Sequence, residues 1–234
     1  MLAIKVLTAL GFSAALLLSA QPVSGLNALS LRPKAECMKT VKAEAKKSAK
    51  EGARYFGGAD LMNCDLRKAV LKRIDLSGAN LSGANLIRAN LTSITLSGAN
   101  GNLMPDLTRA ILTKANLSYA NLGGSDFTGA TLIGANLYYS VATNVNFSNA
   151  NLSGANLTLM EFLYANLSGA NLTNANLTKA YGLEADFTNA NLTNANLSNS
   201  TLRSANFTGA NLTGADLSGA DLTGATMPDG SIHP

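Results

Sequence analysis

A large apolar residue recurs at every fifth position from Phe56 almost to the C-terminus. One run of centres extends from Leu61 to Leu96, and after a shift of one residue a second extends from Leu107 to Met227. The consensus is Ala-(Asn/Asp)-Leu-(Ser/Thr)-X, whose residues we number positions 1 to 5. An α-helix with this spacing would bury no face. The repeat therefore predicts a solenoid, in which each unit buries its apolar side by stacking on its neighbours.

The repeat resembles that of the pentapeptide-repeat family. The resemblance implies an all-β fold, a right-handed quadrilateral parallel β-helix with four pentapeptides per coil, which gives about eight coils here. We expect a signal peptide at 1–25, an N-terminal helical cap at 26–54, the β-helix at 55–227 and a C-terminal tail at 228–234. The resemblance is carried by segments such as Ala59-Asp60-Leu61, Ala79-Asn80-Leu81, Ala170-Asn171-Leu172 and Ala215-Asp216-Leu217.

Two patterns in the sequence support a coil of twenty residues. Four of the phenylalanines are separated by multiples of twenty, which would stack them on one wall. On another wall Phe162 would lie between Ala142 and Gly182, so that one large residue is compensated by two small ones. The stacked set is Phe127, Phe147, Phe187 and Phe207.

The N-terminal segment has the layout of a secretory signal peptide. Lys5 precedes an apolar run at 6–18 and then small residues, with cleavage expected after Gly25 or, alternatively, after Ala20. A retained membrane anchor is the other reading, although the run is short for a span. Together with the Ala-Asn-Leu repeat, this resembles pentapeptide-repeat proteins of the cyanobacterial or chloroplast thylakoid lumen. We expect Sec-type export to the lumen or a periplasm, with no membrane contact after signal removal.

The segment after Pro33 reads as one amphipathic helix with lysines off its apolar stripe. It could lie on an anionic membrane, but the stripe is mostly alanine, and docking on the end of the rod is favoured. In an oxidising compartment Cys37, on the stripe, and Cys64, at a position 1, predict a disulfide. The alternative is that Cys64 is only a small core residue.

Composition excludes most catalytic functions. Charged residues make up 14% of the chain and His233 is the single histidine, so a histidine general base or a multi-histidine metal site is excluded. Residues 55–234 hold nine Lys/Arg and eleven Asp/Glu without sustained acidic rows. We therefore expect no catalytic residue, cofactor, metal site or nucleic-acid partner, and no mimicry of a DNA duplex.

Apolar and aromatic residues break the polar exterior near the middle of the rod. Exposed patches of this composition mark interaction sites. Glu161 and Glu184 are close by, and Val141 is expected to point outward with them. Alternatively, Val141 and Leu183 turn inward in place of Ala142 and Gly182. The candidate protein-contact residues are Tyr138, Tyr139, Leu163, Tyr164, Tyr181, Leu183 and Arg203.

The sequence thus predicts a non-catalytic extracytoplasmic scaffold or protein-interaction module with an unidentified protein partner. The alternative is a small-ligand or surface-binding protein that uses flat Ser/Thr arrays such as Thr128, Ser148 and Ser168. The shift at 97–106 predicts a bulge or short loop. The C-terminal end has little to cover its edge, so we expect a monomer or a weak end-to-end dimer.

Overall fold

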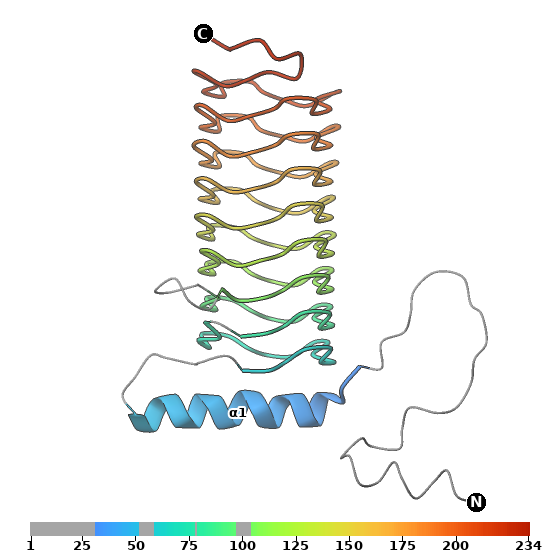
Figure 1. Cartoon of the computed structure of the whole chain (residues 1–234), viewed down its shortest axis with the longest axis vertical. Helices are drawn as coiled ribbons and strands as arrows, with labels where there is room; N and C mark the ends of the chain where they lie inside the picture. Colours follow the sequence, from blue (N-terminus) through green and yellow to red (C-terminus); the bar gives the residue numbers. More distant parts are fainter. Residues whose placement is uncertain (1–30, 52–58, 78, 97–103) are drawn as a thin grey trace, which may run out of the picture.

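The computed structural model describes residues 31–51, 59–77, 79–96 and 104–234, and only the backbone of 44–51. Helix α1 (Lys34–Glu51) lies across one end of a rod of stacked coils, and the C-terminus lies at the other end (Figure 1). No helix within these ranges is long and apolar enough to cross a membrane. The predicted signal peptide and its cleavage sites lie outside the described residues.

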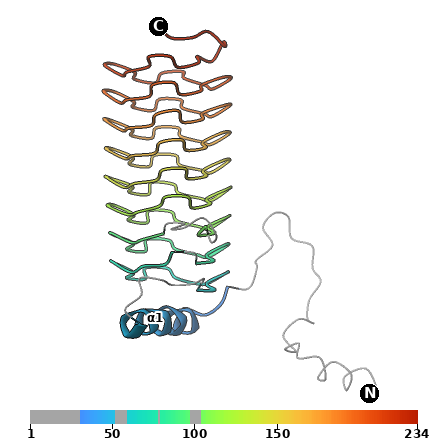
Figure 2. The ribbon, with the colours of Figure 1, turned by 60° about the vertical axis from the view of Figure 1, so that its left-hand side comes forward.

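Each coil of the rod has four sides, and each side contributes a single parallel β-bridge rather than an extended strand (Figure 2). Position-2 residues pair with residues twenty further along, as Asp126 does with Asn146. The predicted period of four pentapeptides per coil is therefore confirmed. We number the sides faces 1 to 4, which begin with Asp60, Asp65, Val70 and Asp75 respectively.

The corners explain the consensus. At one corner the N–H of Ala150 donates to the carbonyl of Phe147 over 3.0 Å, and Asn149 has a φ of 56°. This is the pattern of a type II turn, whose third residue needs a positive φ and so favours Gly or Asn. The Asn146 side chain accepts a 3.0 Å bond from the N–H of Ser148. Position 2 is Asn or Asp because its side-chain oxygen caps the position-4 N–H.

The core is filled by position-3 side chains that stack from coil to coil. Phe127 lies 4.9 Å from Phe147, and Phe187 lies 4.8 Å from Phe207, measured between ring centroids on face 1. On face 4 a Cβ atom at Gly182 would overlap the ring of Phe162. The ring therefore occupies the space that a central side chain at Gly182 would fill, which confirms the predicted volume compensation.

The register changes once. Asn80 pairs with Asp106 and Thr95 with Asn121, twenty-six residues apart instead of twenty. The predicted bulge or loop falls on residues 97–103, which lie outside the described residues. The coils before and after it still stack directly, so the insertion leaves the ladder intact.

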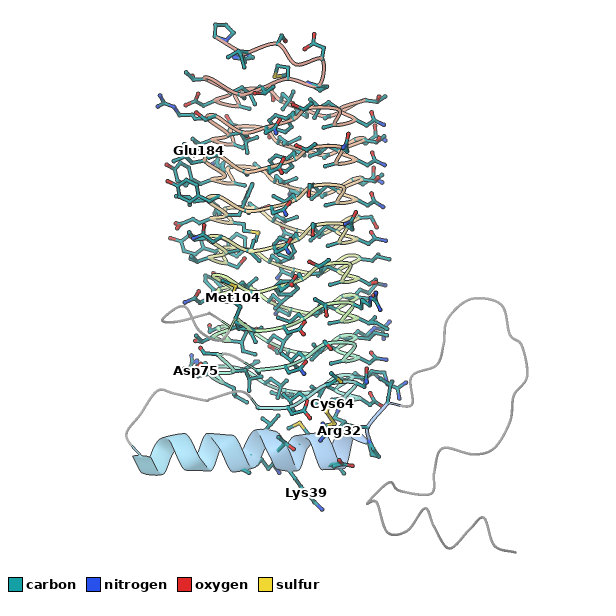
Figure 3. The ribbon with its side chains drawn as sticks, in the orientation of Figure 1. Arg32, Lys39, Cys64, Asp75, Met104 and Glu184 are labelled. Atoms are coloured by element: carbon teal, nitrogen blue, oxygen red, sulfur yellow. A yellow bond between two sulfur atoms is a disulfide. The ribbon has the colours of Figure 1, made fainter. Side chains whose placement is uncertain are left out.

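The N-terminal end of the rod is closed by α1 and the residues before it. The Sγ atoms of Cys37 and Cys64 are bonded at 2.11 Å, and Val41 is buried beside them. The Nζ of Lys34 donates to the carbonyl of Arg67 over 2.7 Å, and Nη1 of Arg32 donates to the carbonyl of Asp60 over 3.0 Å. Carbonyls that would otherwise end the ladder unpaired thus receive donors (Figure 3).

The C-terminal residues 228–234 fold back on the last coil. Thr226 and Ile232 form an antiparallel bridge, and the N–H of His233 donates to the carbonyl of Ala225 over 2.8 Å. Leu212 and Leu217, on faces 2 and 3, are only partly buried. The tail therefore covers part of the edge and leaves faces 2 and 3 open.

Candidate protein-contact surface

In the coils from residue 115 to 224, backbone strain distinguishes one face of the rod from the others. The non-glycine position-5 residues of the stacked coils have φ between 53° and 58°, a region that costs most side chains about 1 kcal/mol relative to Gly or Asn. From residue 115 to 224, position 5 at the corners away from face 4 is Gly or Asn throughout. Every exception borders face 4: Tyr119, Tyr139, Leu159, Tyr164, Lys179, Glu184 and Ser204.

Over four successive coils, face 4 also lacks the side-chain caps that the repeat provides. In these four coils, position 2 of face 4 is a residue other than Asn or Asp. Over the same stretch, from 146 to 216, every position 2 on faces 1 to 3 is Asn or Asp. The position-4 N–H groups on face 4 therefore lose the acceptor that the repeat provides. The four residues are Val141, Glu161, Tyr181 and Thr201.

Most of the side chains that replace the consensus on and beside face 4 are aromatic or aliphatic. The ring of Tyr119 lies 5.6 Å from that of Tyr138 and 5.7 Å from that of Tyr139. Tyr139 is 53% exposed and Tyr164 is 49% exposed. Glu184 projects from the same side of the rod (Figure 3). We call these residues the face-4 patch: Tyr119, Tyr138, Tyr139, Val141, Leu159, Leu163, Tyr164, Tyr181 and Leu183.

The structure places the predicted contact residues on both borders of face 4. Tyr138 and Tyr139 lie at the corner before it, and Leu163, Tyr164 and Leu183 at the corner after it, on either side of Tyr181. Arg203 lies one coil further and approaches Asp221, with Nε 3.9 Å from the carboxylate.

The alternative register is wrong. Ala142 and Gly182 are buried, whereas Val141 is 39% exposed and Leu183 is only partly buried. Sequence reasoning missed Tyr119 and Leu159. Their signal was available, because they stand twenty residues before and after Tyr139.

The comparisons place the chain among known proteins. Residues 56–100, 110–149, 125–159, 143–178, 165–203 and 185–224 match the model of pentapeptide repeats, in eight copies. The chain belongs to the pentapeptide-repeat family. A search of curated proteins returned no match. Family membership implies the right-handed quadrilateral β-helix, and pentapeptide-repeat proteins are generally not enzymes.

Three solved structures illustrate this pentapeptide-repeat likeness. HetL, involved in heterocyst differentiation regulation in the cyanobacterium Nostoc, is 33% identical with a TM-score of 0.59 over 82% of this chain and 98% of its own. A protein of the Arabidopsis thaliana thylakoid lumen is 32% identical, TM-score 0.21, over 53% and 65%. The fluoroquinolone resistance protein QnrB1 is 19% identical, TM-score 0.45, over 71% and 88%.

Two carboxylates near the C-terminal end of this pentapeptide-repeat rod are poorly suited to accept a proton. The N–H of Ser218 lowers the pKa of Asp216, and the hydroxyl of Thr223 lowers the pKa of Asp221. Both stay ionised at neutral pH, on different faces. Within the described ranges no three His, Cys, Asp or Glu residues are grouped as metal ligands would be.

The strain at position 5 leads to a test on stability. We expect Tyr164→Asn to raise the free energy of unfolding by about 0.5–1 kcal/mol, because asparagine adopts a positive φ at lower cost. Asn144, in the same column one coil earlier, provides the matched reverse change, and Asn144→Tyr should destabilise by a similar amount. Denaturant unfolding measures both, and a Tyr164→Asn protein less stable than wild type would contradict the strain argument.

Proposed function

We propose that this protein is a non-catalytic extracytoplasmic scaffold that binds a protein partner through the face-4 patch. One observation carries the proposal. Between residues 135 and 224, strained side chains and missing caps coincide on one face, and there they expose tyrosine and valine. Natural sequences depart from local structural preference chiefly where function requires it. Exposed aromatic surface is typical of protein contacts.

Two features support a compartment outside the cytoplasm. Residues 1–25 have the layout of a Sec-type signal peptide. The disulfide between Cys37 and Cys64 is of the kind that persists where thiols are oxidised. We infer a thylakoid lumen or a periplasm.

The Ser/Thr arrays are less suited to ligand binding than the sequence suggests. The hydroxyl of Thr128 donates to Asp126 over 2.6 Å, and that of Ser168 donates to Asn166 over 2.6 Å. These hydroxyl protons are therefore used within the turns. The observation favours the scaffold over the ligand-binding alternative.

Affinity capture from the native extracytoplasmic compartment tests the patch. We expect the Tyr164→Ser/Tyr181→Ser protein to capture at least tenfold less of one or more proteins than the wild type does. The reason is that truncating interface aromatics costs about 2 kcal/mol or more of binding free energy. Ile133→Ser is the matched control, since Ile133 is 39% exposed on the corner between faces 2 and 3. Identical captured sets from wild type and the tyrosine variant would remove the patch as the contact surface.

A further inference from the structure

The charges of the rod are segregated along its axis. Residues 59–114 hold seven Lys/Arg and four Asp, whereas residues 115–234 hold two Lys/Arg and seven Asp/Glu. Six of the seven cations border face 3 in the first three coils, and all six are exposed. They are Arg67, Lys68, Lys72, Arg73, Arg88 and Lys114.

Three of these cations form a straight column. Lys68, Arg88 and Lys114 occupy position 5 at the corner between faces 2 and 3. The N–H of Lys68 donates to the carbonyl of Ile87 over 2.9 Å, and that of Arg88 donates to the carbonyl of Thr113 over 3.0 Å. The three residues therefore stand on successive coils, about 4.8 Å apart at the usual spacing of paired β-strands.

The column occupies backbone positions that favour glycine or asparagine. Lys68, Arg88 and Lys114 have φ of 54°, 55° and 56°. The next coils fill the same place with Gly134 and Gly154, which adopt this φ at no steric cost. Long cationic side chains at these positions thus go against the preference of position 5 for Gly or Asn, as the tyrosines beside face 4 do. This second strained set lies on a different part of the rod.

The column cations have no ion-pair partner among the described residues. Arg67 is different, because its guanidinium bonds the Asp65 carboxylate over 2.7 Å and thereby lowers the pKa of Asp65. A hollow of about 280 Å³ at the foot of the column is lined by Lys34, Asp65, Arg67 and Lys68. Lys34 and Arg67 already have hydrogen-bond partners there. The positive charge that remains for binding a ligand therefore belongs to the column and not to the hollow.

We propose that the column of Lys68, Arg88 and Lys114 is a docking surface for an acidic α-helix of a partner protein. The three cations span about 10 Å. Carboxylates at i, i+3 and i+7 lie on one helix face and span about 10.5 Å. An extended segment is a poorer match, because its same-face side chains are about 6.7 Å apart.

The charge distribution also favours a protein over a membrane. A flat anionic bilayer lying along face 3 would meet the later coils as well, where the only charged residues on or beside this face are Lys179 and Asp216. A short helix would contact only the basic coils. The rod would then hold partners at two separate places, the column and the face-4 patch, as a scaffold does.

Two alanine-rich helical peptides of identical composition test this proposal. One carries three glutamates at i, i+3 and i+7, and the other carries them on three different helix faces. We expect the full-length protein to bind the first peptide at least tenfold more tightly in a fluorescence anisotropy titration, with an affinity that falls as salt is added. Equal affinities for the two peptides, or no binding of the first, would overturn the proposal.

Asparagine variants assign the binding to the column. Lys68→Asn/Arg88→Asn/Lys114→Asn should weaken binding of the first peptide at least tenfold without harming the fold, because asparagine suits this backbone. Lys179→Asn removes a cation from the same repeat position beside face 4 and should change the affinity less than twofold. A triple variant that binds like wild type refutes the assignment. The proposal is also refuted if the wild-type protein sediments with phosphatidylglycerol vesicles and the triple variant does not, because the column would then bind a membrane.

Discussion

Replacing Gly182 by leucine, the residue that the repeat prescribes at this position, is expected to lower the free energy of unfolding by about 3 kcal/mol. The reason is that the ring of Phe162 already occupies the volume that a side chain at Gly182 would fill, so that a Cβ atom there would overlap it. Phe162→Leu alone should cost about 1–2 kcal/mol through the space it vacates. The double variant restores leucine on both coils and should return close to wild-type stability.

The four proteins form a double-mutant cycle, measured by guanidinium unfolding. We expect a coupling energy of about 3–4 kcal/mol between Phe162 and Gly182, which is large because the two positions share one volume. Phe162 also contacts Phe187, with ring centroids 6.0 Å apart, so Phe162→Leu will not be fully compensated. Additive effects of the two substitutions would mean that the core relaxes around the leucine and that Gly182 is not required by Phe162.

This pair illustrates why much of the fold could be predicted from the sequence. In a solenoid each residue contacts mainly its own coil and the next. A period of twenty therefore brings Phe147 and Phe187 to one wall, and Phe162 under Gly182, without knowledge of any distant contact. The same reasoning placed Val141 on the outside but left an inward register open, and the structure decides between the two.

The elements that the repeat does not generate were less accessible. Arg32 and Lys34 close the carbonyls of the first coil, but no periodicity links residues 32–34 to that coil. The role of position 2 was also missed, because an Asn or Asp every five residues shows a spacing and not the hydrogen bond that its side chain accepts. Without knowledge of that bond, the loss of caps on face 4 could not be recognised from the sequence.

The face-4 patch and the cation column depart from the repeat in the same way, with residues that its turns do not favour. A pentapeptide coil obtains its stability from small or amide residues at position 5 and capping residues at position 2. Larger side chains at those positions therefore lower stability locally. The fold tolerates them because neighbouring coils with the consensus sequence maintain the backbone hydrogen bonds on both sides. Surfaces of this kind are found by asking where a regular repeat departs from the residues that its own turns prefer.

Removing the Cys37–Cys64 disulfide is expected to lower the free energy of unfolding by about 3 kcal/mol, from the loop entropy that the bond removes. The bond joins α1 to the first coil across a sequence separation of 27 residues. Cys64→Ala restores the alanine that the repeat has at position 1, so the core should remain filled. The Cys37→Ala/Cys64→Ala protein, studied by denaturant unfolding, therefore isolates the cross-link from the packing.

Hydrogen exchange should locate this loss at the N-terminal end of the rod. A solenoid transmits instability only through nearest-neighbour contacts. Amide protection in α1 and in residues 59–77 should fall, while protection beyond residue 115 remains. Wild type treated with reductant should match the double variant. An unchanged unfolding midpoint would show that the contacts of Arg32, Lys34 and Val41 hold α1 without the bond. A uniform loss of amide protection would show that the coils unfold as one cooperative unit. That result would contradict the nearest-neighbour argument, on which the Gly182 prediction also depends.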